Sequence, residues 1–220
     1  MGKEKNRKTI DKPNLILCEG EDATQFIIRY LLYLQKAERL FFDFLALDFG
    51  GNEELPTFLS DLLYYPGFDI VKTIIIVRDA EGNHGNAVKS IQSALRKSEF
   101  PVPSETNKIE KNNNVKVAFS LFPSLSATNL NGTLEDLYIK NLAEEGVEVV
   151  AGDIRSFLEN LKTKGRKFTW FHKTMLHTYF SITDDYVTKK IGQATEAGAF
   201  NFECSEMSLL KNLMICIAKE

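Results

Sequence analysis

Acidic residues directly follow two short hydrophobic runs, and they are the residues in this chain best suited to chemistry. Glu19 comes after the run Leu15–Cys18, and Asp79 and Glu81 come soon after the run Thr73–Val77. Carboxylates that lie close together repel each other unless a cation joins them. Clusters of oxygen ligands suit Mg²⁺ or Mn²⁺, so these acids indicate a site for a divalent cation.

The two runs would place these acids at one edge of a sheet. Short β-branched runs followed by helix-forming segments are typical of buried parallel strands, and ligands of open α/β sheets bind beyond the carboxyl ends of the strands. Asp22, three residues after Glu19, can face the same point across a strand-to-helix turn. Asp79 and Glu81 would point to the same side if the backbone stays extended. We therefore expect Glu19, Asp22, Asp79 and Glu81 to share one solvent-open cleft.

Helix capping is the alternative explanation for several of these acids. Asp22 and Gln25 have the spacing of a capping box, and so do Thr133 and Asp136. Glu135 is a further candidate metal ligand, but acids in the first turn of a helix also favour the helix dipole. The role of Asp136 stays open. Helix capping alone does not explain why acidic residues follow two separate strands.

Strands and helices alternate over the first two thirds of the chain, which predicts an α/β fold with a central parallel sheet of about four strands. Thr73–Val77 is expected inside this sheet, because it is the most apolar strand. The predicted strands are Asn14–Cys18, Phe41–Leu47, Thr73–Val77 and Val115–Leu121, with a short edge strand at Glu148–Ala151. The predicted flanking helices are Asp22–Lys36, Glu53–Leu63, one from Asn83 or Asn86 to about Lys97, and Thr133 to about Leu142.

We expect three regions along the chain. Residues 1–12 form a flexible basic N-terminus, residues 13–151 form the α/β domain, and residues 152–220 form a helical extension packed on that domain. Residues 100–114, rich in Pro and Asn, are expected to form a long loop.

Composition and charge are those of an ordinary globular protein. Of the 220 residues, 44% are hydrophobic and 26% are charged, and the net charge of −3 indicates no particular partner. No apolar stretch reaches membrane-spanning length and no signal peptide is visible, so we expect a cytoplasmic protein without a membrane partner. Three cysteines lie far apart, which predicts reduced, mostly buried thiols: Cys18, Cys204 and Cys216.

Three segments of the chain resemble the TOPRIM motifs. The segment from Leu15 to Asp22 resembles the first motif, Asp48–Asn52 resembles the glycine turn after the second strand, and Asp79–Glu81 resembles the Asp-x-Asp motif after the third. The resemblance covers about residues 14–121. Segments 134–137 and 171–173 are similar to the small stand-alone relatives of the overcoming-lysogenization-defect (OLD) nucleases. One departure is Glu81, which stands where the family motif has its second Asp.

The resemblance implies a Mg²⁺- or Mn²⁺-dependent cleavage of phosphodiesters. Glu19 would be the proton-transfer or metal-binding glutamate, and Asp79 and Glu81 would be metal ligands. Metal ions can activate water and stabilise the attacking and leaving oxygens. Lys173 is a candidate for stabilising charge on the phosphoryl group. The substrate would be DNA, RNA or a small nucleotide.

A basic segment near residue 165 has two interpretations. Basic residues interleaved with aromatic ones suit single-stranded nucleic acid. The alternative is an amphipathic segment whose aromatic side chains belong to the core and whose cations are merely solvated. The residues concerned are Lys162, Lys164, Arg166, Lys167, Phe168, Trp170, Phe171 and Lys173.

Two other functions remain as alternatives to a nuclease. One is a non-catalytic module that binds Mg²⁺ with a nucleotide or nucleic acid, beside a partner protein. The other is a receiver-like domain phosphorylated on Asp79, which the pairing with Glu81 and the helical extension fit poorly. No P-loop and no G-x-G-x-x-G motif occurs, which leaves ATP-driven or NAD-dependent chemistry without support. The oligomeric state is open.

Overall fold

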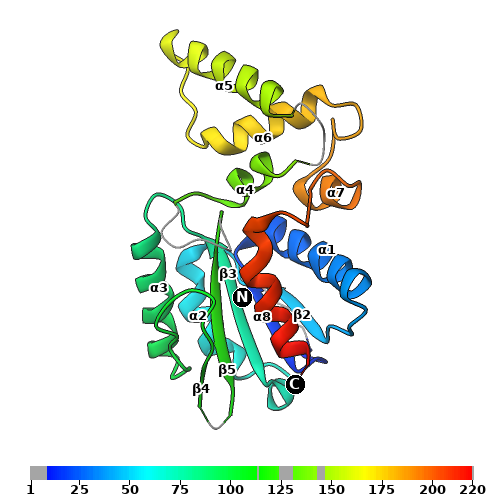
Figure 1. Ribbon diagram of the computed structural model, residues 1–220. Coiled ribbons are helices and arrows are strands. Elements are labelled where there is room, and N and C mark those ends of the chain that lie inside the picture. The colour runs from blue at the N-terminus through cyan, green and yellow to red at the C-terminus, as the bar shows by residue number, and fades with distance from the viewer. Residues whose placement is uncertain (1–8, 113, 124–130, 143–146, 220) are drawn as a thin grey trace, which may run out of the picture.

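A mostly parallel five-stranded sheet forms the centre of the molecule (Figure 1). The computed structural model describes residues 9–112, 114–123, 131–142 and 147–219. Its strands are β1 (Asn14–Cys18), β2 (Phe44–Asp48), β3 (Thr73–Asp79), β4 (Glu110–Lys111) and β5 (Lys116–Phe122). The order is β2-β1-β3-β5-β4, and only the short edge strand β4 is antiparallel to its neighbour. The predicted α/β class is confirmed, and β3 is an inner strand.

The register brings the carboxyl ends of three strands to the same level. Cys18, the last residue of β1, pairs with Asp48 of β2 on one side and with Val77 of β3 on the other. Strand β3 continues for two more residues, so Asp79 is the end of the strand and not part of the following turn.

Helices cover both faces of the sheet. In chain order they are α1 (Gly20–Glu38), α2 (Leu55–Leu62), α3 (His84–Lys97), α4 (Leu134–Lys140), α5 (Val147–Thr163), α6 (Phe171–Ile182), α7 (Ile191–Glu196) and α8 (Ser208–Ala218). Short 3₁₀ turns occupy Asn52–Glu54, Phe68–Ile70 and Ser205–Met207.

Alternate residues of each strand belong to opposite cores, as the period of two requires. On β1, Leu15 and Leu17 pack with α2 and α3, whereas Ile16 and Cys18 pack with α1 and the C-terminal helices. Burial on both faces is the reason that the inner strands are continuous hydrophobic runs. Helices α7 and α8 pack on the same face of the sheet as α1.

The helical hairpin formed by α5 and α6 lies beyond α4, at the end of the molecule where the parallel strands finish (Figure 1). The predicted edge strand Glu148–Ala151 is wrong, because these residues belong to α5. Val150, Ile154 and Leu158 recur every four residues, and Ile154 and Leu158 are buried, which is a helical pattern. The predicted domain boundary at residues 151 and 152 therefore falls inside a helix.

Other expectations concern the loops, the N-terminus and the cysteines. The predicted loop 100–114 contains strand β4. Residues 1–8 of the predicted flexible N-terminus lie outside the described residues. Cys18 is buried but Cys216 is exposed, so the thiols are not mostly buried as expected.

None of the helices in the described ranges has both the length and the apolar character needed to cross a membrane.

Candidate functional site

The connections between strands create a crevice between β1 and β3. Helix α1 connects β1 to β2 across one face of the sheet, and α3 connects β3 to β5 across the other face. The chain therefore leaves two adjacent strands in opposite directions, which is the arrangement at which α/β sheets bind ligands. Glu19 follows β1 and Asp79 ends β3, so both acids lie at this point.

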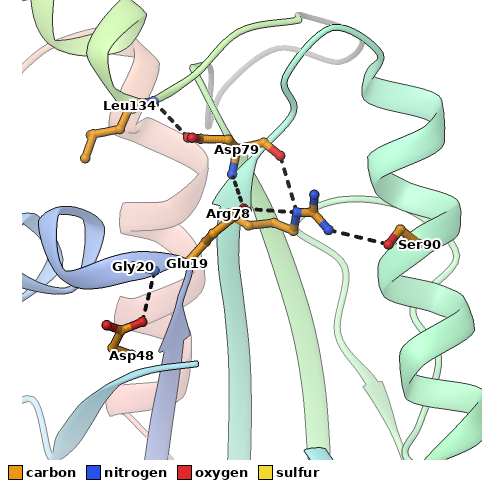
Figure 2. Close-up of polar contacts among 7 residues, drawn as sticks. All are labelled: Glu19, Gly20, Asp48, Arg78, Asp79, Ser90 and Leu134. Atoms are coloured by element: carbon orange, nitrogen blue, oxygen red, sulfur yellow. Dashed lines mark hydrogen bonds and ion pairs between the residues drawn. The ribbon is translucent and has the colours of Figure 1, made fainter. Parts of the chain in front are cut away.

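Glu19 contacts the end of β3 and does not cap its own helix. It occupies the N-cap position of α1, but its side chain makes no capping hydrogen bond. Its Oε2 instead accepts a hydrogen bond from the backbone N of Asp79 at 3.3 Å and lies 3.3 Å from Nε of Arg78 (Figure 2). Burial raises the pKa of Glu19 and the nearby Arg78 opposes the rise, with a net increase.

Arg78 is the buried cation of the site, with a side chain that is 3% exposed. Its Nε is 3.4 Å from the backbone O of Asp79, and one terminal nitrogen is 3.5 Å from the Ser90 hydroxyl on α3 (Figure 2). A buried arginine requires a charged partner. Arg78 thus holds the Glu19 carboxylate in place.

Asp79 joins the sheet to α4. Its Oδ1 accepts a hydrogen bond of 2.9 Å from the backbone N of Leu134, at the start of α4 (Figure 2). Burial raises the pKa of Asp79 to about 8, and the nearby charges of Glu135 and Glu19 add to the increase. Asp79 therefore lies close enough to two other carboxyl groups to be repelled by them, which is the condition that a bound cation relieves.

Glu81 has a backbone that the sequence does not predict. Its φ is 52°, in the left-handed region, so the expected extended backbone from Asp79 to Glu81 is wrong. Reciprocal backbone hydrogen bonds of 2.7 Å between Glu81 and Gly132 hold this conformation. The rule that residues two apart share one side of a strand therefore does not apply here, yet both acids line the same pocket.

Asp48 connects the two glycine-containing turns. Its Oδ1 accepts hydrogen bonds from the backbone N of Gly20 at 3.0 Å and of Gly50 at 2.7 Å. Gly20 and Gly50 both have φ near +85° (80° and 89°), which favours glycine. The turn after β1 and the turn after β2 are therefore fixed against each other.

A pocket of about 680 Å³ opens over these strand ends. Its acidic side is formed by Glu19, Asp79 and Glu81, and other lining residues come from the start of α6 and the loop before it. The lining residues are Glu19, Gly20, Gly50, Gly51, Asp79, Glu81, Gly82, Gly132, Thr133, Asp136, Thr169, Trp170, His172 and Lys173.

Two predicted ligands, Asp22 and Glu135, do not line this pocket. Asp22 is half-buried on α1, and the helix begins before it at Gly20, so the capping box with Gln25 does not form. Glu135 is buried on α4, and its Oε1 lies 3.3 Å from Nζ of Lys173. The buried carboxylate of Glu135 thus holds the Lys173 ammonium group in its position at the pocket.

Asp136 has a structural role. Its Oδ2 accepts from the backbone N of Thr133 at 2.9 Å, completing a capping box at the start of α4. Within the described ranges, no three His, Cys, Asp or Glu side chains are grouped as a ready-made metal site. A cation at this pocket would therefore need water or substrate oxygens to complete its coordination.

Sequence reasoning gave Arg78 no role, named Asp48 only as part of the glycine turn, and did not place Trp170 or His172 at the pocket. Arg78 and Asp48 position the acidic side, and Trp170 and His172 line the pocket. Arg78 had a visible signal, because an arginine at the end of a wholly apolar strand needs a partner. Trp170 was identified as part of the basic segment but not as part of this pocket.

Residues 13–215 match the family described as "Protein of unknown function (DUF3226)", and this match spans most of the 220 residues, so the chain belongs to that family. No curated protein matches it, and no solved structure matches it.

Proposed function

We propose that this DUF3226 family member is a phosphodiester-cleaving enzyme of the TOPRIM type that acts with Mg²⁺ or Mn²⁺. The observation that carries the proposal is the contact between Glu19, which follows β1, and Asp79, which ends β3, at the crevice between these two strands. Glu19 accepts a hydrogen bond from the backbone of Asp79, and both line an open pocket.

The TOPRIM assignment is supported by the arrangement of the three motifs. The strands that precede them are adjacent in the order β2-β1-β3, and Asp48 binds the backbone of both Gly20 and Gly50. The first two motifs are therefore parts of one local structure, and the third follows the neighbouring strand.

The donor set fits a hard divalent cation. Mg²⁺ is usually bound by one or two carboxylates together with water and substrate phosphate, and not by a complete protein cage. Asp79 and Glu81, with Glu19 beside them, offer oxygen donors at the pocket. Mutual repulsion contributes to the raised pKa of Asp79, and a cation would relieve it. When bound, the ion would polarise a phosphoryl oxygen and acidify a bound water.

The other groups of the pocket suit proton transfer and charge stabilisation. The raised pKa of Glu19 brings its proton exchange closer to neutral pH, which favours general acid–base catalysis. Arg78 keeps the Glu19 carboxyl oriented. Lys173, paired with Glu135, presents a cation at the pocket wall where a phosphoryl group would develop charge.

The test is cleavage of labelled DNA and RNA, single- and double-stranded, by the purified chain. Cleavage should require Mg²⁺ or Mn²⁺, stop with EDTA, and fall about 100-fold in Glu19→Gln without loss of folding. Glu21→Gln is the matched control, because Glu21 is exposed two residues away on α1. Activity that survives EDTA, or an unchanged rate in Glu19→Gln, would refute the proposal.

A second measurement separates an enzyme from a binding module. At pH 8, Mg²⁺ or Mn²⁺ should raise the melting temperature of the wild type but not that of Asp79→Asn. Asp61→Asn, an exposed acid on α2, should respond as the wild type does. A metal-dependent shift without any cleavage would favour the non-catalytic module acting with a partner protein.

A further inference from the structure

The connection between α5 and α6, together with the adjoining helix ends, carries several basic residues and no acidic one. From Lys162 to Lys173, five of the 12 residues are Lys or Arg and none is acidic, whereas the whole chain has 27 basic and 30 acidic residues. We call residues 162–173 the basic segment. Its last five residues supply four of the side chains that line the pocket, namely Thr169, Trp170, His172 and Lys173.

Most cations of the basic segment are exposed and available. Lys164, Arg166 and Lys167 are exposed and form no ion pair with any residue that the structure describes. Lys162 differs, because its Nζ lies 3.7 Å from the centre of the Phe171 ring. Adjacent cations without a compensating acid repel each other and attract a polyanion.

The aromatic residues of the basic segment divide into two kinds. Phe168 and Phe171 are half-buried and pack against the hydrophobic core, which the amphipathic interpretation predicts for all of them. Trp170 does not follow that pattern, because it is 60% exposed and lines the pocket. A large aromatic ring left in water beside a row of cations suits the stacking of a base.

We infer that the basic segment binds single-stranded nucleic acid, with a base stacked on Trp170 and backbone phosphates near Lys164, Arg166 and Lys167. The inference rests on the proposed function only for what happens to the strand after binding. The acidic side alone would repel a phosphodiester, and the basic segment supplies the attraction that the pocket needs. A single strand fits better than a duplex, because a base must be unstacked to lie on the ring.

The chain contains one tryptophan, so its fluorescence reports on this position alone. An oligothymidylate of about 12 nucleotides, added in EDTA at low salt, should quench the Trp170 emission in a saturable way. The corresponding duplex should bind more weakly. If the labelled oligonucleotide binds without quenching the Trp170 emission, the proposed stacking is wrong. If the duplex binds as tightly as the single strand, the proposed preference for single strands is wrong.

Variants separate stacking from charge. Trp170→Leu should weaken binding of the labelled oligonucleotide about tenfold in an anisotropy titration. Arg166→Gln/Lys167→Gln should reduce the slope of log affinity against log salt by about 1.4, which corresponds to two phosphate contacts on a single strand. The control is Arg96→Gln/Lys97→Gln, which removes the same charge from exposed positions at the far end of α3.

Each variant has a result that would reject the inference. Unchanged affinity of Trp170→Leu for the oligonucleotide would reject it. A control variant whose salt slope falls as much as that of Arg166→Gln/Lys167→Gln would also reject it. Heparin that competes as well as the oligonucleotide would show that charge alone is recognised, and would also reject it. Circular dichroism should show that Trp170→Leu folds, because the ring is exposed.

Binding in EDTA is independent of metal-dependent cleavage. Glu19→Gln/Asp79→Asn, which removes the proposed chemistry, should bind the oligonucleotide at least as tightly as the wild type. If binding behaves as described and cleavage is never found, only the proposed function fails. If cleavage is found and Trp170→Leu changes neither the binding nor the rate, only the inference fails.

Discussion

The two sides of the pocket are built in opposite ways. On the acidic side, Glu19 and Asp79 lie at strand ends, accept backbone hydrogen bonds and lie beside the buried Arg78. In the basic segment, Trp170 is 60% exposed, and Lys164, Arg166 and Lys167 have no carboxylate partner among the described residues, whereas Lys173 pairs with Glu135. One side is fixed by the sheet, and the other faces solvent.

This difference indicates how each side should respond to substitution. Groups that react must be positioned accurately, and buried partners supply that accuracy. Groups that only attract a flexible strand need charge and an exposed ring. Substitutions on the acidic side should therefore change stability strongly, whereas substitutions in the basic segment should change binding with little effect on stability.

The largest effect on stability is expected for Arg78→Met. Removing the buried guanidinium leaves the Glu19 carboxylate without its cation, which should cost about 3 kcal/mol of unfolding free energy at pH 7. Urea denaturation measures this loss. The loss should shrink at pH 5, because the pKa of Glu19 rises further without Arg78 and the protonated acid no longer needs a partner.

The control for this substitution is Arg96→Met on the exposed surface of α3, which should stay within about 0.5 kcal/mol of the wild type. Equal losses in the two variants would show that Arg78 is not a buried partner of the acidic side, and the contrast between the two sides would disappear.

Asp79→Asn should stabilise the protein, and the gain should depend on pH. The folded state keeps a proton on Asp79 up to a pKa of about 8, whereas the ordinary value is 3.8. Stability of the wild type is therefore lost as pH rises through this interval, and the asparagine variant avoids that loss. We expect the two proteins to be similar near pH 4 and the variant to be more stable at pH 8, where nearly all of that loss has accumulated.

Parallel urea titrations at several pH values measure this difference. A variant that is destabilised equally at every pH would contradict the repulsion between Asp79 and its neighbours. The variant should keep the hydrogen bond from the Leu134 backbone N, because the asparagine side-chain oxygen can accept it as well.

A smaller effect is expected for Asp136→Ala. This substitution removes the capping box of α4 and should cost about 1 kcal/mol, independent of added Mg²⁺. Thermal melts with and without the metal provide the measurement. A variant that also loses the stabilisation by Mg²⁺ would show that Asp136 takes part in metal binding.

The smallest effect on stability is expected for Arg166→Gln/Lys167→Gln in the basic segment. Both side chains are exposed, so the unfolding free energy should change by less than about 0.5 kcal/mol. Urea denaturation of this double variant, compared with that of Arg78→Met, gives the sharpest test of the contrast. A loss above 1 kcal/mol would indicate a structural role for these cations.

The sheet could be predicted from the sequence because its strands are buried on both faces. Continuous apolar runs such as Ile74–Val77 are typical of strands that are buried on both faces. The acids that follow these runs in the sequence therefore lie at the ends of the strands. The segment at residues 148–151 was misassigned because two adjacent valines resemble a strand. The decisive signal was the four-residue spacing to Ile154 and Leu158.

The site was only partly predictable, for a physical reason. Glu19 and Asp79 depend on strand ends, which local sequence specifies. The position of Trp170 depends on α6 packing on α4, through contacts such as Tyr138 with Phe180, whose ring centroids are 5.6 Å apart. Contacts between residues so distant in the sequence leave no periodic pattern. Glu81 likewise depends on its pairing with Gly132.

The left-handed backbone of Glu81 has a consequence for how this protein would change under selection. A residue with a side chain costs roughly 1 kcal/mol or more in that conformation, whereas Gly, and to a lesser degree Asn, adopts it readily. A library screened only for heat resistance should therefore be enriched in Gly or Asn at position 81. A library screened for cleavage should retain an acid there, so the two populations would diverge at this residue.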